Sequence, residues 1–492
     1  MVYSRAVKVS ILRNVSNKIY QRSEMKGMAP KAYKYNNYRD TLYINQKFLE
    51  FFTFMMSIFV TTPIIAIKIQ HRYFSLFSIF FGLFFITLFT KIVLAKSPII
   101  MGKHSKLYIL WLYLSLISSF FGLIYFSSLP EWFDQVLSYV PKIFLFLAIL
   151  IFFSMLNEKE KNRISKIFFI GFLIGCIMNI IWAITDGIGF YLFGFSLSNL
   201  IFKNYLIEEL GPVRAFASII HSGTIRVSGF NYDPAHLGGI IPIIILFSLL
   251  RRNNLLLLLS IITLIFSQST TGLVSSLILI LLNFDKIFSL KFENLSKLLN
   301  RMFFILTIFV CILLLFHNPN SKVIQSITNN FEGFLHRIYE NYLIIEETNP
   351  RIIYHLHIPV ALSYAGGRIL TGTGFGTSSY SYLFNSLTPK VLHETPRPYD
   401  PESTYISYLF DVGVLGLILY IFILYKLYGH FSKSYKYEMN SFVFSSIGGI
   451  IFSGLFYHYT LTAYQVLIII MASSLADMQQ KSKNMLFEVK NG

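Results

Sequence analysis

Charged residues are scarce in this chain. Asp, Glu, Lys and Arg make up only 13% of its 492 residues, where a soluble protein carries roughly a quarter. This deficit excludes an ordinary water-soluble globular protein. Hydrophobic residues reach 54%, and 50 phenylalanines stand among long Leu and Ile runs. Such a chain would expose large apolar patches and aggregate in water, so we expect a surface that faces lipid.

Cysteine is almost missing. Cys176 and Cys311 are the only two, and both stand inside hydrophobic runs, which predicts buried apolar side chains and neither a disulfide nor a metal pair. The net charge of +18 does not indicate nucleic-acid binding, because the basic residues collect between hydrophobic segments. That distribution is typical of a membrane protein oriented by its charges.

Apolar runs near the length of a membrane crossing predict about twelve transmembrane helices. They lie near 48–68, 74–90, 107–127, 141–156, 166–187, 235–250, 254–267, 271–284, 302–316, 404–425, 440–457 and 461–477. The short pair 254–267 and 271–284 flanks the polar run Ser267–Gly272. One long broken helix is the rival interpretation, but two spans fit better because the combined run is too long for one crossing. The predicted fold class is an all-α polytopic membrane helix bundle.

The connectors after alternate helices are basic, as at Arg251 and Arg252. The positive-inside rule assigns their common face to the cytoplasm, which predicts a multi-pass protein with both termini cytoplasmic. The first apolar run begins at residue 48, so no cleavable signal peptide is expected. Residues 1–47 are predicted to form a basic cytoplasmic arm near anionic lipid, with residues 1–24 outside the native chain if Met25 or Met28 is the true start. Residues 48–492 are predicted to form the polytopic membrane domain, including its external loops.

Polar residues concentrate in two segments predicted to be external, 188–234 and 317–403. The second is the longest connection and therefore the place where function is expected. Between Ile324 and Ile345 its apolar residues recur at spacings of three and four. This spacing predicts an amphipathic helix, either on the membrane or packed on the bundle.

The first external segment holds Arg214 and then Arg226, and it ends at Asp233-Pro234. Asp233 is expected to cap a helix that Pro234 opens. Arg226 has no comparable structural role. Its guanidinium either binds a phosphate through two hydrogen bonds or contacts lipid head groups at the interface.

The second external segment holds Arg351 and Arg368, and a glycine run that ends at Gly376. No Lys-Ser/Thr follows this run, so a nucleotide loop is not indicated. A tight turn where the chain closely approaches a ligand or a helix is expected instead. The histidines lack zinc spacing, so no metal is predicted.

Glu402 stands where this segment meets an apolar helix, with His393 and Arg397 nearby in sequence. A partly desolvated carboxylate there could serve as a general base. The structural alternative is an acidic residue favoured by the helix dipole.

Four features together make the chain resemble the O-antigen polymerase/O-antigen ligase family of bacterial envelope glycosyltransferases. They are Arg226-Val227-Ser228-Gly229-Phe230 with Asp233-Pro234, the run Ser267–Gly272, Arg351 before Gly372–Gly376, and the segment at Glu402. The ligase branch has a His and a small polar residue, nine residues, and then Gly-x-x-Gly opening a helix. Here Glu402-Ser403 precedes Gly413-Val414-Leu415-Gly416 at that spacing, with Glu in place of His. The resemblance covers roughly residues 170–425.

The resemblance implies glycosyl transfer from undecaprenyl pyrophosphate at the outer leaflet of the bacterial inner membrane, without metal or cofactor. Glu402, or else His393, would be the base. The arginines would bind pyrophosphate or sugar; they are Arg226, Arg351, Arg368, Arg214 and Arg397. The missing ligase His favours a polymerase that joins repeat units of O-antigen, capsule or exopolysaccharide. An O-antigen ligase acting on lipid A-core is the runner-up, and a polysaccharide flippase or other transporter is the alternative from another class. Implied partners are the lipid-linked oligosaccharide, membrane lipids, a chain-length regulator and a flippase, with no nucleic acid.

Overall fold

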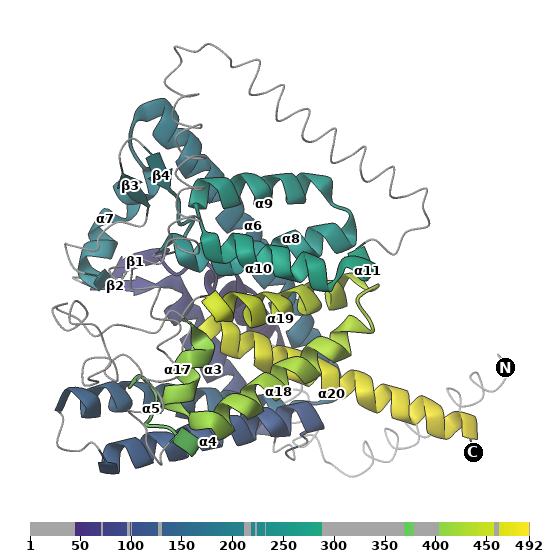
Figure 1. Cartoon of the computed structure of the whole chain (residues 1–492). Helices are drawn as coiled ribbons and strands as arrows, with labels where there is room; N and C mark the ends of the chain where they lie inside the picture. Colours follow the sequence, from purple (N-terminus) through teal and green to yellow (C-terminus); the bar gives the residue numbers. More distant parts are fainter. Residues whose placement is uncertain are drawn as a thin grey trace, which may run out of the picture.

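A computed structural model shows a bundle of helices with two short β-hairpins (Figure 1). It describes residues 45–69, 72–95, 99, 101–125, 130–210, 218–221, 224–231, 233–287, 369–377, 403–456 and 462–491. The predicted span 302–316, the amphipathic helix predicted between Ile324 and Ile345, and the arm 1–47 up to residue 44 lie outside these ranges.

Helices make up most of the described chain, and residues 45–59 form the first of them. The named helices that follow are α3 (Leu76–Ala95), α4 (Lys103–Tyr125), α5 (Pro130–Met155), α6 (Glu158–Phe193), α7 (Leu197–Leu210), α8 (Pro234–Arg251), α9 (Asn254–Ser267), α10 (Thr270–Leu282), α11 (Phe284–Ile287), α17 (Thr404–Asp411), α18 (Gly413–Ser432), α19 (Glu438–Phe456) and α20 (Ala463–Asn491). Strands β1 (Ala66–Ile69) and β2 (Arg72–Ser75) form one antiparallel hairpin, and β3 (Ile219–His221) and β4 (Thr224–Arg226) form the other.

Six helices in the described part of the chain are long and apolar enough to cross a membrane, and two more, α9 and α10, are apolar but shorter. The six are α3, α4, α5, α6, α8 and α18. Many of their large apolar side chains are exposed, for example Ile86 and Val93 on α3 and Ile124 on α4. The predicted all-α membrane bundle is confirmed in this coarse form, while the count of twelve spans stays a prediction.

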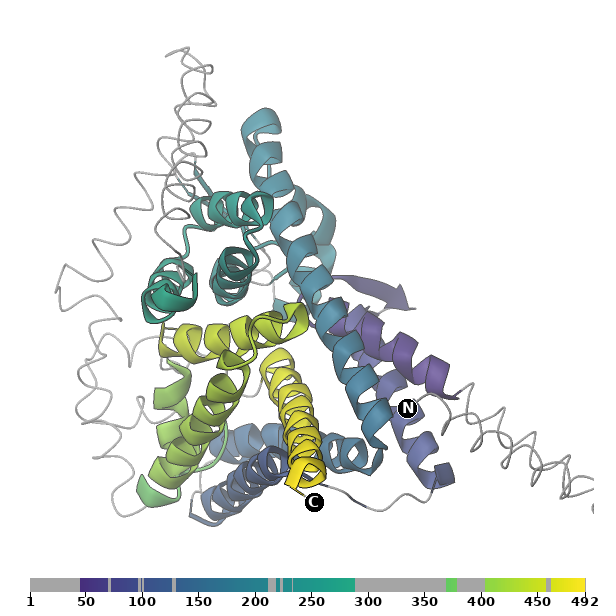
Figure 2. The ribbon, with the colours of Figure 1, turned by 90° about the vertical axis from the view of Figure 1, so that its right-hand side faces the viewer.

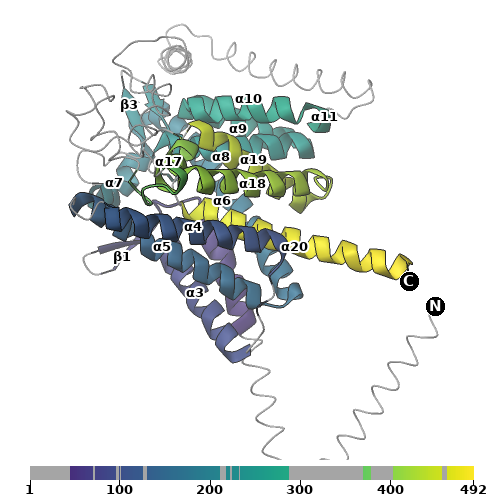
Figure 3. The same ribbon diagram turned by 60° about the horizontal axis from the view of Figure 1, so that its bottom comes forward.

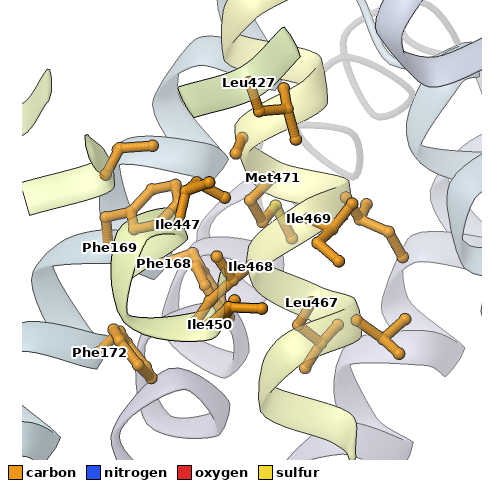
Figure 4. Close-up of a cluster of buried hydrophobic side chains, with 14 of the residues drawn as sticks. Phe168, Phe169, Phe172, Leu427, Ile447, Ile450, Leu467, Ile468, Ile469 and Met471 are labelled. Atoms are coloured by element: carbon orange, nitrogen blue, oxygen red, sulfur yellow. The ribbon is translucent and has the colours of Figure 1, made fainter. Parts of the chain in front are cut away.

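The bundle has two groups of helices joined by α6, α19 and α20. Helix α8 packs against α9, α10 and α19, whereas α4 packs against α5, α18 and α20. Figure 2 shows α6 as the long helix that passes both groups, and it contacts α9 as well as α20. Figure 4 shows part of the core, where Phe168 and Phe172 of α6 lie near Ile450 of α19 and Ile468 of α20. Burial of these apolar faces fixes the mutual positions of the two groups.

The helix ends form two faces at opposite ends of the bundle. One end, here called the hairpin face, carries β1 to β4, α7 and the start of α17 (Figure 1). The other, here called the basic face, carries the connectors α5–α6, α8–α9 and α18–α19 (Figure 3). Ion pairs join elements at the basic face, including Arg163 Nη2 to Glu50 Oε2 at 2.8 Å and Lys481 Nζ to Glu158 Oε1 at 2.5 Å. That this face is cytoplasmic stays a prediction.

Several helix bounds differ from the predicted spans. The span predicted at 48–68 ends as a helix at residue 59, before Thr61-Thr62-Pro63, and the chain then enters β1. The span predicted at 166–187 belongs to the 36-residue helix α6, which starts at a capping box formed by Asn157 and Glu160. At 1.5 Å per residue α6 is roughly 54 Å long, and so exceeds a bilayer core of about 30 Å. It therefore extends into the segment predicted to be an external loop from residue 188.

Candidate functional site

Arg226 lies at the end of strand β4, on the hairpin face. Its neighbours Ile225 and Val227 are fully buried in an apolar cluster with Leu237 and Phe266, whereas Arg226 itself is half-buried. The alternation of a strand explains this pattern, because successive side chains point to opposite sides. The amide of Val227 donates to the carbonyl of Phe266 at 3.1 Å. This hydrogen bond fixes the backbone beside Arg226 against the last turn of α9.

The polar run Ser267–Gly272 forms the turn between α9 and α10, so the predicted pair of helices is confirmed. Gln268 ends α9 with φ at 48°, and the hydroxyl of Ser269 caps α10 by accepting the amide of Gly272 at 3.1 Å. Gly238 of α8 approaches so closely that a Cβ there would lie 2.0 Å from Ser269 Oγ. Polar side chains in the run are buried, so the motif is a packing centre between three helices.

Asn179 of α6 holds the chain just after Arg226. Its Oδ1 accepts the amide of Phe230 at 2.9 Å and Nδ2 of Asn231 at 2.8 Å, and its own Nδ2 donates to the carbonyl of Thr61 at 2.6 Å. Gly229 has φ at 64°, and a Cβ on it would lie 2.9 Å from Asn179 Oδ1. Only glycine therefore fits at this position without displacing Asn179.

A second residue of α6, Asp186, holds the chain at the start of the hairpin. The carboxylate is fully buried. Its Oδ1 accepts the amide of Ser198 at 3.0 Å, its Oδ2 accepts Ser218 Oγ at 2.7 Å, and Ser196 Oγ donates to both oxygens. The amide of Ser228 donates to Ser218 Oγ at 3.4 Å. One carboxylate thus links α6, the start of α7 and the segment that carries Arg226.

We expect Asp186→Ala to destabilise the folded protein by about 3 kcal/mol, because the change leaves several buried donors without an acceptor. Asp186→Asn keeps one oxygen and the shape, so it should cost much less. Thermal unfolding of the purified variants checks this ranking. Equal melting temperatures for the alanine variant and the unmodified protein would contradict the role of Asp186 in linking these segments.

Asp233 caps α8 as predicted. Its Oδ1 accepts the amide of Ala235 at 2.6 Å, and Pro234 occupies the first helical position. The cap satisfies an amide that the helix itself leaves without a partner. This gives Asp233 a structural role at the start of α8.

The glycine run forms the predicted tight turn, and its close neighbour is a helix junction. Gly372 and Gly374 have φ values of 80° and 102°. The amides of Thr373 and Gly374 donate to the carbonyls of Phe410 and Asp411, each at 2.9 Å. The amide of Gly374 also approaches Ser118 Oγ of α4 at 3.2 Å. The turn is therefore fixed to α4 and to the end of α17.

The span predicted at 404–425 is broken into α17 and α18 at Val412. Gly413, with φ at 73°, opens α18, and a Cβ there would lie 2.5 Å from the amide nitrogen of Gly372. Ser403 is buried just before α17, where its hydroxyl donates to the carbonyl of Gly454 at 3.2 Å. The chain that follows Glu402 is thus anchored to α19.

Of the predicted site residues, the structure describes only Arg226. The other six lie outside the described residues; they are Arg214, Arg351, Arg368, His393, Arg397 and Glu402. The structure does describe Ile369, which follows Arg368, and Ser403, which follows Glu402. The convergence of the arginines with Glu402 stays a prediction.

The sequence interpretation did not single out Asn179 or Asp186 as site residues. Both stand in the predicted span 166–187, and a lone Asp in an apolar helix is a signal that could have identified Asp186. Within the described ranges, no group of three or more His, Cys, Asp or Glu could hold a metal ion. Arg226 offers a cationic side chain in this part of the site.

A family model described as "O-Antigen ligase" matches residues 255–421. The matched stretch is similar to the O-antigen ligase/polymerase family. Proteins of that family are membrane glycosyltransferase-like enzymes. The match and the six apolar helices of the described chain together indicate an integral membrane protein. No curated protein matches the chain.

The stretch that matches the O-antigen ligase/polymerase family runs from α9 into α18. It includes three of the four features that carried the resemblance, at Ser267–Gly272, at Arg351 to Gly376 and at Glu402. Arg226 precedes the matching stretch, but the amide of Val227 beside it is bonded to Phe266, which lies inside. The fold therefore connects the fourth feature to the family segment.

Proposed function

We propose that the protein polymerises oligosaccharide repeat units linked to undecaprenyl pyrophosphate, at the outer leaflet of the bacterial inner membrane. The product would be O-antigen, capsule or exopolysaccharide. The single observation that supports this proposal most directly is the docking of the strand with Arg226 onto α9, within the segment that matches the family. Through this hydrogen bond, the strand that carries Arg226 and precedes the matching segment lies beside the start of the run Ser267–Gly272.

The chemistry explains why a fixed cation matters here. When the glycosidic bond to the lipid breaks, negative charge develops on the departing diphosphate. A guanidinium held in place stabilises that charge without reorganisation during the reaction. Asn179 and Asp186 hold the backbone on both sides of Arg226 through buried hydrogen bonds, which suits such a role.

In the proposed step, Glu402 accepts the proton of a hydroxyl on the acceptor sugar. The hydroxyl oxygen forms a bond to the anomeric carbon of the donor sugar while the bond from that carbon to the diphosphate oxygen breaks. The lipid diphosphate leaves, neutralised by Arg226 and Arg351 with Arg368 and Arg214 behind them. His393 is the alternative base, and Arg397 would orient either one. Apolar helix faces would hold the prenyl tail.

The second candidate function is transfer of a finished polymer to lipid A-core by an O-antigen ligase. The description of the matching family favours it. Glu402 at the position where the ligase branch has His favours the polymerase. The glycosyltransferase-like character of the family disfavours the flippase or transporter alternative.

Deletion of the gene separates these functions. Without a polymerase, the cell should display single repeat units in place of long chains, and complementation should restore the chains. Without a ligase, polymer should accumulate on the lipid carrier and lipid A-core should carry none. Normal long chains on the surface of the deletion strain, together with normal ligation, would refute both transfer functions.

A further inference from the structure

A pocket opens on the basic face, between the start of α4, the end of α18 and the middle of α20. Its volume is about 440 Å³, and it is lined by Lys103, Lys426, Lys433, His104 and His430, with Tyr425 at the rim. The three lysines are exposed and come from two helices far apart in sequence. Among the described residues around the pocket none is acidic. The pocket is therefore a concave site with a concentrated positive charge.

The carboxylate that contacts the pocket residue His104 is already engaged by several donors. Asp477 of α20 accepts the amide of His104 at 2.8 Å and the amide and hydroxyl of Ser105 at 3.1 and 2.8 Å. Its Oδ1 also lies 2.9 Å from Nδ1 of His104. The carboxylate thus caps the first turn of α4 and positions the His104 ring, which meets the ring of His430 at 5.7 Å. Asp477 itself does not line the pocket; it acts on the pocket by holding His104 in its wall.

Exposed apolar side chains continue from the pocket along both flanking helices. On α4 the residues at successive helical turns below Lys103 are Leu110, Tyr113 and Ile117, all exposed. On α18, Phe422 and Ile421 lie one turn before Tyr425, and Ile418 lies two turns before it. All three are exposed. The spacings of three and four place each set on one side of its helix, and α4 and α18 pack against each other. A basic pocket thus adjoins two apolar stripes.

We propose that this pocket binds the phosphate head group of an anionic phospholipid, whose acyl chains lie along the exposed stripes of α4 and α18. The charge of the lysines complements a phosphate, and the volume admits a head group with its glycerol. The stripes decide between the two sources of phosphate. A free phosphate ion needs only the basic pocket, whereas a lipid uses the pocket and the apolar stripes together. The site lies at the end of the bundle opposite Arg226 and does not depend on the proposed transfer reaction.

Binding of phospholipid to the full-length protein in detergent tests the proposal, with phosphatidylglycerol as the probe and phosphatidylcholine as the neutral comparison. Native mass spectrometry or a fluorescent lipid titration gives the dissociation constants. We expect phosphatidylglycerol to bind preferentially. The triple variant Lys103→Gln, Lys426→Gln and Lys433→Gln should lower its affinity by at least about tenfold, since each basic side chain contributes to attraction of an anionic lipid.

The matched control changes three exposed lysines outside the pocket by the same charge: Lys159→Gln, Lys166→Gln and Lys203→Gln. It should stay within about twofold of the unmodified protein, because these lysines do not line the pocket. Inorganic phosphate at millimolar concentration should not displace the lipid. Equal losses in both triple variants, no preference for the anionic lipid, or full displacement by inorganic phosphate would each overturn the proposal.

If the pocket variant does not fold, the salt dependence of lipid binding to the unmodified protein tests the proposal instead. A preference for phosphatidylglycerol that persists at high salt would show that the lysines do not carry it.

Discussion

Glu402→Gln should stop chain extension while leaving the amount of protein in the membrane unchanged. The amide keeps the shape of the side chain but cannot accept the proton of the acceptor hydroxyl. Loss of a general base lowers the rate by about 10²–10⁴-fold, which would leave only single repeat units on the cell. The measurement is the length distribution of the surface polysaccharide in a deletion strain that expresses the variant.

Two further variants interpret this result. Glu332→Gln changes a carboxylate elsewhere in the same segment 317–403 and should leave chain length unchanged. His393→Ala tests the alternative base and should also permit extension if Glu402 is the base. Full-length polymer from Glu402→Gln would refute its role, and loss of extension only in His393→Ala would transfer that role to the histidine.

Arg226→Ala should lower turnover by about 10²–10³-fold, the loss of about 2.7–4 kcal/mol of transition-state stabilisation that follows removal of one fixed donor. The strand itself should survive the change, because Ile225 and Val227 remain buried and the bond from Val227 to Phe266 does not involve the side chain. Transfer by the purified variant from a lipid-pyrophosphate-linked repeat unit measures the effect. Arg351→Ala should cost a similar amount.

Arg226→Lys separates charge from geometry. Lysine keeps the positive charge but cannot form two parallel hydrogen bonds to a phosphate, so an intermediate rate indicates a guanidinium that contacts the diphosphate. Melting temperatures close to that of the unmodified protein show that the effect is not a loss of folding. Unchanged turnover in the alanine variant would leave Arg226 as an interfacial residue that contacts lipid head groups.

The sequence predicted best those elements whose limits are set by local chemistry. The ends of α8, α9 and α10 agree with prediction to within a few residues because Asp233, Ser269 and Gln268 supply caps and turns at those points. The break at Val412 was missed, although the Gly-x-x-Gly that opens a helix was recognised. It depends on contact between Gly413 and Gly372, which are far apart in sequence, and no local pattern reveals that contact.

In the candidate site, too, residues with a local signal in the sequence were predicted, and residues defined by tertiary contacts were not. Arg226 stood out because it lies in a polar segment just before a hydrophobic helix, and the structure places it on the hairpin face beside α9. Hairpin β3–β4 was not predicted, because three-residue strands are too short to give an alternating pattern. Asn179 and Asp186 become functional candidates only when their partners at Phe230 and Ser218 are known. Tertiary hydrogen bonds of this kind cannot be inferred from a single chain.

The fixed turn at Gly372–Thr377 and the buried Ser403 have a mechanical consequence for the polar stretch between them. The described residues on either side, Thr377 and Ser403, belong to segments that are bonded to the helix bundle. Consecutive Cα atoms lie about 3.8 Å apart, so the anchor of Ser403 on α19 sets by covalent geometry how far from the helix bundle the adjoining Glu402 can be.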